Sequence, residues 1–338
     1  MKKFPGLFFC ILLVSGSHSY AVDASSFPGL TSVTALAGAD EFVNIYGSYA
    51  QALSNHYGKA VIFSNHLSYP VGEDHLGAFP RTYIGIGMGA AFANTNAIKS
   101  DSSSEVTGDA LPAVLPAAGL SLNLGIGLSN NWDFRLTALP PISFSLPQGD
   151  LTTTIKLMNF KGKLTYNLKE SKSFDTGFSI AGYVAYSKGS VGISAENLKS
   201  ENRDFSSNSG SGTVQDFSYN VNTTAAWNYF SMGTEVRGWV DLYIIVPYIG
   251  YGLGFQGGLF STDVGLDGTI QVNVNVVTET SPADVNVGRT AKPSILSHRF
   301  FLGFEIKIKP TPVRLGVEAQ FELENKLAGI SLGAAMQF

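Results

Sequence analysis

The sequence predicts an all-β fold, an antiparallel transmembrane β-barrel of about 12 strands (10–14) with an N-terminal helical plug or cap. Three observations support this prediction. Many segments alternate apolar residues with small or polar ones, as strands between lipid and a lumen do. The last such segment, Leu327 to Phe338, ends the chain on an aromatic residue. The first residues have the layout of a secretory signal, which would send the chain to an envelope compartment.

The signal peptide is expected at residues 1–21. Lys2 and Lys3 precede an apolar run, and small residues occur near Ala21. Cys10 lies inside the apolar run, whereas a lipidated cysteine would follow it. If the signal is cleaved, the mature chain has no cysteine, which suits an oxidising compartment.

The composition favours a barrel over a soluble domain. Charged residues make up 14% of the chain, against roughly 25% in soluble domains. The net charge of −4 gives no reason to expect nucleic acid as a partner. Two uncharged stretches, 110–132 and 242–262, are long enough for a membrane helix. Both contain proline and are apolar only on alternate residues, so strands are the better interpretation.

Charged residues on the polar faces of these strands are the candidate lumen residues. A closed barrel is the only sheet that lipid permits, so its charges must face the lumen. These candidates are Asp133, Arg135, Lys161, Lys163, Arg299, Glu305, Arg314 and Glu318. Two roles stay open for them, selection of a solute and structural pairing across strands. A water-soluble sandwich would explain one or two strands but not the whole series.

Turn lengths predict an orientation. The segments 129–131, 169–173 and 309–312 are short and suit the periplasmic side. The segments 96–114, 197–215 and 279–294 are long and polar and suit outside loops. An even strand number is expected if both chain ends lie in the periplasm.

Residues 22–80 precede the barrel, which is expected to occupy 81–338. An amphipathic helix is predicted from Asp40 to Tyr57, with Gly58 as its stop. Its apolar residues recur at helical spacing, and the candidates to line a plug or ligand path are Phe42, Tyr46, Tyr49 and Leu53. We expect the segment to plug or cap the barrel. A periplasmic tail that docks elsewhere is the alternative, and a membrane-surface helix is disfavoured because no basic face is present.

The layout resembles the FadL-like family of outer-membrane importers of hydrophobic compounds. The segment ADEFVNIYGSYAQALSNHYG leads through HLGAFPRTYIGIGMGAAF into the barrel, and the chain ends in phenylalanine. The resemblance is one of layout over the whole mature chain. It carries no Asn-Pro-Ala element of the family's hatch, and the chain is short for fourteen strands. It implies a hydrophobic small molecule as substrate and transfers no binding residue.

Motifs of enzymes, metal sites and cofactors are nearly absent, so we expect no enzyme, no metal and no cofactor. The glycine-rich GIGMGA at 85–90 lies within a predicted strand, and GEDH at 72–75 fits a solvated turn better than a cation site. The prediction is an outer-membrane channel of a diderm bacterium for passive uptake of hydrophobic or small solutes, gated by the N-terminal plug.

A surface-exposed structural or adhesin-type barrel that acts through its outer loops is the alternative. The expected partners are outer-membrane lipid and the barrel-assembly machinery, which would read the C-terminal strand with Phe338 as assembly signal.

Overall fold

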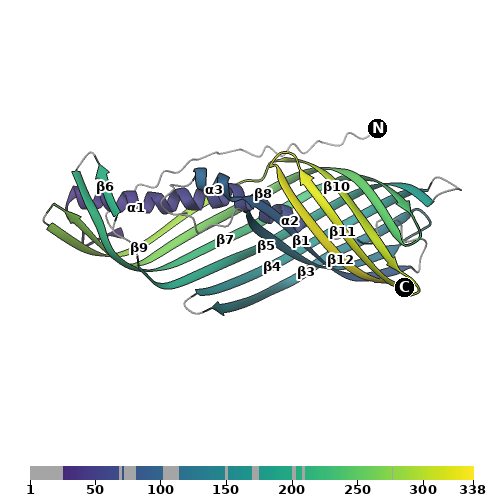
Figure 1. The fold of residues 1–338 in the computed structure, drawn as a ribbon, viewed down its shortest axis with the longest axis horizontal. Helices are drawn as coiled ribbons and strands as arrows, with labels where there is room; N and C mark the ends of the chain where they lie inside the picture. The colour runs from purple at the N-terminus through teal and green to yellow at the C-terminus, as the bar shows by residue number, and fades with distance from the viewer. Residues whose placement is uncertain are drawn as a thin grey trace, which may run out of the picture.

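The computed structural model describes residues 26–67, 71, 81–101, 114–148, 151–169, 175–199, 203–207, 210–275 and 277–338. The predicted signal peptide and the 72–75 turn lie outside these residues. The described part contains one antiparallel sheet and an N-terminal helical segment that runs along it (Figure 1). None of its helices is long and apolar enough to cross a membrane.

Twelve strands make up the sheet of the described residues, and the ten that close the ring lie within the predicted range of 10–14. The twelve strands are β1 (Thr82–Asn94), β2 (Val114–Gly127), β3 (Trp132–Gln148), β4 (Leu151–Lys169), β5 (Asp175–Lys199), β6 (Arg203–Ser207), β7 (Gly210–Asp241), β8 (Ile245–Val274), β9 (Val277–Ala291), β10 (Leu296–Ile308), β11 (Val313–Glu322) and β12 (Leu327–Gln337).

Ten of these strands close into a ring, which removes the sheet edges that lipid would not tolerate. The order is β1-β2-β3-β4-β5-β7-β8-β10-β11-β12, and β12 pairs with β1 from Gln337 opposite Tyr83 to Ala328 opposite Phe92. Phe338 extends this ladder, because its N–H donates to the Thr82 carbonyl at 2.8 Å. Among the described residues, β6 pairs with β7 alone and β9 with β8 alone, so both lie outside the ring.

The ring has the inverted polarity of a membrane protein. Large aliphatic side chains point outward and stay accessible, among them Ile86 at 63% and Leu302 at 62% exposure. Many inward positions of the ring strands are polar or charged and buried, such as Arg299 and Glu305. Apolar surface of this extent is not left open to water by a soluble monomer, so the ring is built to sit in lipid.

Five strands of the ring continue far beyond it. β12 has 11 residues, enough for one bilayer crossing, whereas β7 has 32 and β8 has 30. The continuations of β3, β4, β5, β7 and β8, together with β6 and β9, form a curved sheet that we call the extension (Figure 1). It projects from the end of the ring opposite to Thr82 and Phe338. The prediction of a loop at 279–294 is wrong, because most of this segment is strand β9.

The helical segment is longer than predicted. α1 (Val33–Ala52) runs through a π-helical turn, η2 (Leu53–Tyr57), into α2 (Gly58–His66). Ser32 caps it by accepting from the Ala35 N–H at 3.1 Å, so Asp40 does not lie in the first turn. Gly58 does not end the helix, because a Cβ there would come within 2.5 Å of the Phe260 ring, and glycine lets the helix continue against β8. A short helix, α3 (Thr95–Asp101), follows β1.

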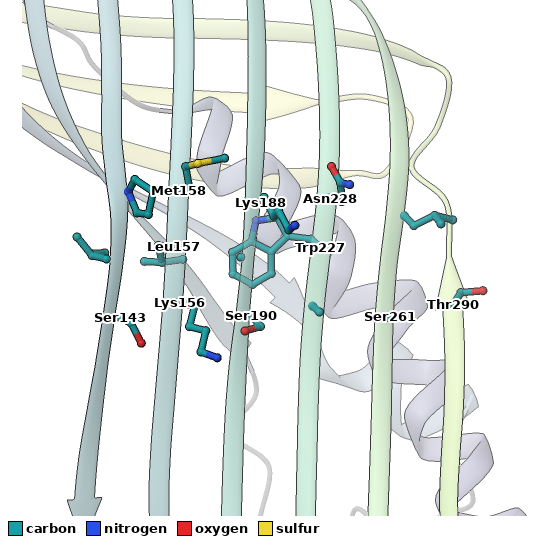
Figure 2. Close-up of a pocket in the computed structure, with 15 residues that line it drawn as sticks. Ser143, Lys156, Leu157, Met158, Lys188, Ser190, Trp227, Asn228, Ser261 and Thr290 are labelled. Carbon is teal, nitrogen blue, oxygen red and sulfur yellow. The ribbon is translucent and has the colours of Figure 1, made fainter.

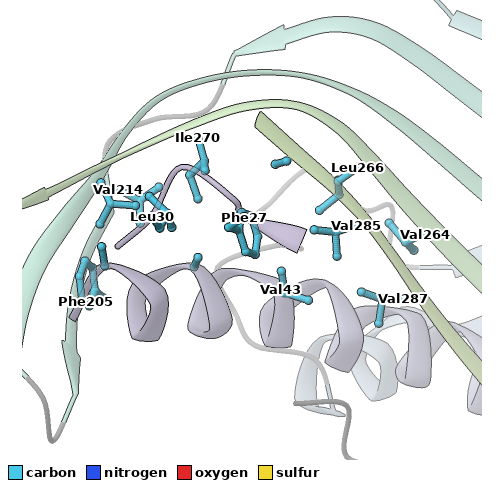
Figure 3. Packing of buried hydrophobic residues seen from close by; sticks show 14 of the residues in the cluster. Phe27, Leu30, Val43, Phe205, Val214, Val264, Leu266, Ile270, Val285 and Val287 are labelled. Carbon is cyan, nitrogen blue, oxygen red and sulfur yellow. The ribbon is translucent and has the colours of Figure 1, made fainter. Parts of the chain in front are cut away.

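α1 lies on the inner face of the extension through its smallest residues. Ala35, Ala39, Val43, Gly47, Ala50 and Ser54 recur every three or four residues and are buried. They pack against Phe27, Leu30 and the inward side chains of β8 and β9 (Figure 3). Small residues let the helix axis come close to the sheet, which an aromatic face would prevent.

Candidate functional site: the ring lumen and the trough of the extension

Charged side chains fill the lumen of the ring. Glu235 of β7 is the centre: its carboxylate lies 3.4 Å from Lys163 Nζ, 3.6 Å from Lys161 Nζ and 3.3 Å from Arg299 Nη2. Arg299 also donates to the Tyr183 hydroxyl at 2.8 Å. Three predicted lumen residues thus converge on one carboxylate that the sequence did not single out.

The other predicted lumen charges also face inward and meet partners there. Arg314 pairs with Glu305 on the neighbouring strand. Glu318 pairs with Arg237 at 3.2 Å, and Asp133 accepts from Asn167 at 2.8 Å. Arg135 is buried at the same level. Pairing across strands is therefore what Asp133, Glu305, Arg314 and Glu318 do in this structure, and the three acids are almost inaccessible to water.

Arg237 was also missed by the sequence prediction. Its guanidinium lies 4.5 Å from the Tyr248 ring centroid and 4.4 Å from that of Phe301. Arg237 and Glu235 lie in a strand whose charges are sparse and whose alternation the sequence analysis did not examine. A scan for isolated charges at period-two positions within tyrosine- and glycine-rich strands would have found both.

The predicted plug residues lie beside the extension. α1 contacts β6, β7, β8 and β9, whereas α2 contacts β1, β2, β7 and β12 at the mouth of the ring. Tyr46 is half-buried against the cluster of Figure 3, and Tyr49 and Leu53 are half-buried as well. The side chain of Phe42 lies outside the described part. α2 makes most of the helical contacts with the ring, and of the 40–57 stretch η2 also reaches β1.

The inner face of the extension is apolar, and we call this face of the curved sheet the trough. Residues directly opposite one another in an antiparallel sheet share a face, so the register defines rows across it. Two rows lead outward from the ring; the first is Ile142, Leu157, Gly189, Trp227 and Phe260, and the second is Phe144, Ile155, Val191, Ala225 and Thr262. Beyond them Leu146, Thr153, Ile193 and Thr223 continue the same face.

α1 covers only one side of this trough. The side built by β8 and β9 is buried beneath it, for example at Val264 and Ile270. The side built by β3, β4 and β5 stays open, with Phe144 at 39%, Leu146 at 47% and Ile193 at 45% exposure. The trough therefore presents accessible apolar side chains next to a helix that leads to the mouth of the ring.

A hydrogen-bonded clasp holds the outer end of α1. The Glu279 carboxylate of β9 accepts from the Ser32 N–H at 3.1 Å and from the Thr31 N–H and hydroxyl. These donors hold the pKa of Glu279 below its usual value. Ser54 provides a second attachment near the ring, since its hydroxyl donates to Thr262 Oγ1 at 2.9 Å.

Comparison with known proteins finds only structures of low similarity. No protein-family model matches the chain, and no curated protein matches it. Among solved structures, the translocator domain of autotransporter NalP from Neisseria meningitidis has a TM-score of 0.34 at 9% identity, covering 86% of this chain and 98% of its own. A Pseudomonas aeruginosa FadL homologue has 0.26 at 8%, covering 84% and 98%. Ail of Yersinia pestis has 0.26 at 11%, covering 76% and 98%.

These neighbours are outer-membrane barrels. At such TM-scores they carry no argument about function, so the class rests on the molecule itself. A closed ring with an apolar outside and a charged inside is an outer-membrane β-barrel. In this barrel, the trough lies outside the ring and is partly covered by α1. It adjoins a ring lumen that is filled by side chains.

Proposed function

We propose that the protein takes up a hydrophobic compound, which binds first in the trough and passes the ring when the segment from α1 to α2 moves. The observation that carries the proposal is the accessible apolar side of the trough. Phe144, Leu146 and Ile193 face inward where α1 does not cover them. Apolar side chains left open on a concave surface are the usual lining of a binding site for an apolar ligand.

The orientation of the chain supports this role. If the terminal strands begin and end in the periplasm, as the short turns predict, the extension lies outside the cell. A hydrophobic solute would then meet the trough before it meets the membrane. Phe338 remains the proposed assembly signal for the barrel-assembly machinery, since it forms the last rung of the ladder that closes the ring.

A water-filled route for small polar solutes is the less favoured form of uptake. Glu235, Lys163 and Arg299 are nearly inaccessible, so side chains occupy the ring lumen at their level. We propose that the gate is the helical segment together with these lumen pairs. A surface protein that binds a partner through the extension is the alternative, and no described feature favours it over apolar binding.

Uptake is tested in cells that express the intact protein, with radiolabelled dodecane as apolar probe and radiolabelled sucrose as polar probe. Expression should raise dodecane entry and leave sucrose entry unchanged. Phe144→Glu combined with Ile193→Glu should lower dodecane entry about 10-fold, because two charges replace the apolar lining. Ser145→Glu, on the opposite face of β3, is the matched control. Equal loss in the control, or entry that does not depend on the protein, would refute apolar uptake and favour the surface-protein alternative.

The gate is tested by locking α1 to β9. A Cβ at Gly47 would lie 3.3 Å from Val287 Cγ1, so Gly47→Cys with Val287→Cys can form a disulfide, and the cleaved chain has no other cysteine. Oxidation should stop dodecane entry, and a reductant should restore it, while each single variant behaves like the parent. Persistent entry in the oxidised pair would show that α1 does not need to move, and binding in the trough would remain open to its own test.

A further inference from the structure

A second hollow lies on the outer face of the sheet, where the strands leave the apolar band of the ring (Figure 2). It has a volume of about 590 Å³. Its floor is a row of small or polar residues opposite one another on successive strands. This row is Ser143, Lys156, Ser190, Ala226, Ser261 and Thr290. The row below it contains Met158, Lys188, Asn228 and Leu259.

Two lysines at this hollow are placed for an anion. Lys156 lies on β4 and Lys188 on β5, in diagonal positions of the two rows, and both are exposed. Side chains at such diagonal positions are about 7–8 Å apart at their origins, so both ammonium groups can reach one phosphate. Within the described part of the chain, neither lysine forms an ion pair. Ser190 and Asn228 add hydrogen-bonding groups beside them.

An aromatic row lies directly beneath the lysines. It consists of Phe160, Tyr186 and Phe230, which are opposite one another on β4, β5 and β7. Aromatic girdles mark the level at which a barrel passes from hydrocarbon to headgroups. The lysines are two to four residues beyond this girdle on the side of the extension. They therefore sit at the level of lipid headgroups rather than in bulk water.

An apolar depression, which we call the dent, lies below the girdle on the same strands. Gly162 and Gly182 leave a depression of about 690 Å³ bordered by Phe160, Val184 and Phe255. Lys156 and Gly162 are six residues apart on β4, roughly 20 Å along the strand. With the usual tilt of barrel strands, this is roughly 15 Å along the membrane normal, half of the hydrocarbon thickness.

We propose that this outer face binds a phosphate-bearing lipid of the outer leaflet, with the phosphate between Lys156 and Lys188 and an acyl chain in the dent at Gly162 and Gly182. Two cations above a girdle and an apolar depression beneath it complement the two parts of such a lipid. A free phosphate would use only the lysines, and an uncharged lipid only the dent. The site faces away from the trough, so it is independent of apolar uptake.

The purified full-length protein in mild detergent is mixed with diphosphorylated, hexa-acylated lipid A, and bound lipid is counted by native mass spectrometry. Lysines near an anionic lipid surface attract its headgroups, so Lys156→Gln with Lys188→Gln should weaken retention at least about 10-fold. Lys292→Gln, an exposed lysine in the β9–β10 connection, should retain lipid A like the parent. Inorganic phosphate at millimolar concentration should not displace it.

A matched pair of glycine variants tests binding of the acyl chain. A Cβ at Gly182 or at Gly238 meets no atom within 4 Å, so valine fits either position on the outer face. Gly182→Val fills the dent and should weaken lipid A retention several-fold, whereas Gly238→Val on β7 near the other end of the ring should not. The shift of unheated samples on gels confirms that each variant is folded.

Equal retention by the double lysine variant and the parent would overturn the proposal. So would displacement by phosphate alone together with normal retention in Gly182→Val, because the protein would then bind only a free anion. Retention of dephosphorylated lipid A as strongly as the diphosphorylated form would overturn it as well.

Discussion

The ring and the extension are made of the same strands, yet their two faces have opposite character. On β4 the inner face is charged in the ring, at Lys161 and Lys163, and apolar in the extension, at Leu157 and Ile155. The outer face changes in reverse, from Leu164 to Lys156. A strand therefore exchanges its apolar and polar faces as it leaves the membrane. The environment outside each face, lipid or water, explains the exchange.

The comparison also explains where the protein is held together by charge and where by apolar packing. Glu235 gathers three cations in the ring, and Arg237 stacks on aromatic rings there. In the extension, α1 covers an apolar cluster that contains Val264, Ile270 and Val285. Three predictions test this difference, from the largest expected effect to the smallest.

Removing Glu235 should destabilise the ring most. Glu235→Leu leaves Lys161, Lys163 and Arg299 close together without their shared carboxylate, which is expected to cost about 3–5 kcal/mol. Urea unfolding of the barrel in detergent, followed by tryptophan fluorescence, measures the loss. Asp267→Leu, an exposed acid on the outer face of the extension, should change stability by less than about 0.5 kcal/mol. Equal stability of Glu235→Leu and the parent would mean that the charge cluster does not hold the lumen.

A lysine introduced at an apolar position should destabilise only the region in which that position is packed, either the ring or the extension. Leu302→Lys places a charge on the lipid face of β10 and should destabilise the ring by about 2–4 kcal/mol. Ile270→Lys places a charge beneath Phe27 and α1 and should release the helix while the ring stays folded.

Hydrogen exchange separates these two outcomes, because only Ile270→Lys should expose the amides of α1. If Ile270→Lys also prevents assembly, or if Leu302→Lys loosens α1 alone, the two regions do not fold as the comparison states.

The smallest effect is a pH dependence of the clasp at Glu279. Hydrogen bonds from Thr31 and Ser32 stabilise the carboxylate, so the pKa of Glu279 is lower in the folded state than in the unfolded state. The stabilisation is therefore complete above the unfolded pKa and is lost as the pH falls through the lower folded pKa.

Limited proteolysis at the start of α1 should accelerate over that acidic range in the parent protein. In Glu279→Gln it should be faster at neutral pH and vary less with pH. A parent protein whose cleavage is constant from pH 7 to strongly acidic pH would contradict the role of the carboxylate.

Much of the ring could be predicted from the sequence, because alternation with a period of two is a local property of the chain. The inward orientation of Arg299, Glu305 and Glu318 follows from that period and from the cost of a charge in lipid. The turns at 129–131 and 309–312 lie where they were predicted, between β2 and β3 and between β10 and β11. The helical character around Tyr46 was also predictable, whereas its ends were not, because Phe260 and Glu279 act on it from distant strands.

The sequence by itself determined that strands dominate, that their charges share one face and that the chain is suited to a membrane barrel. Only the tertiary structure decided what each apolar face meets. Ile270 and Val272 look like lipid-facing residues in the sequence, yet they are buried under the N-terminal segment, because β8 has already left the ring at that point. Alternation records that two faces differ; which of them is covered by lipid, water or a helix depends on strand length and on contacts between residues far apart in the chain.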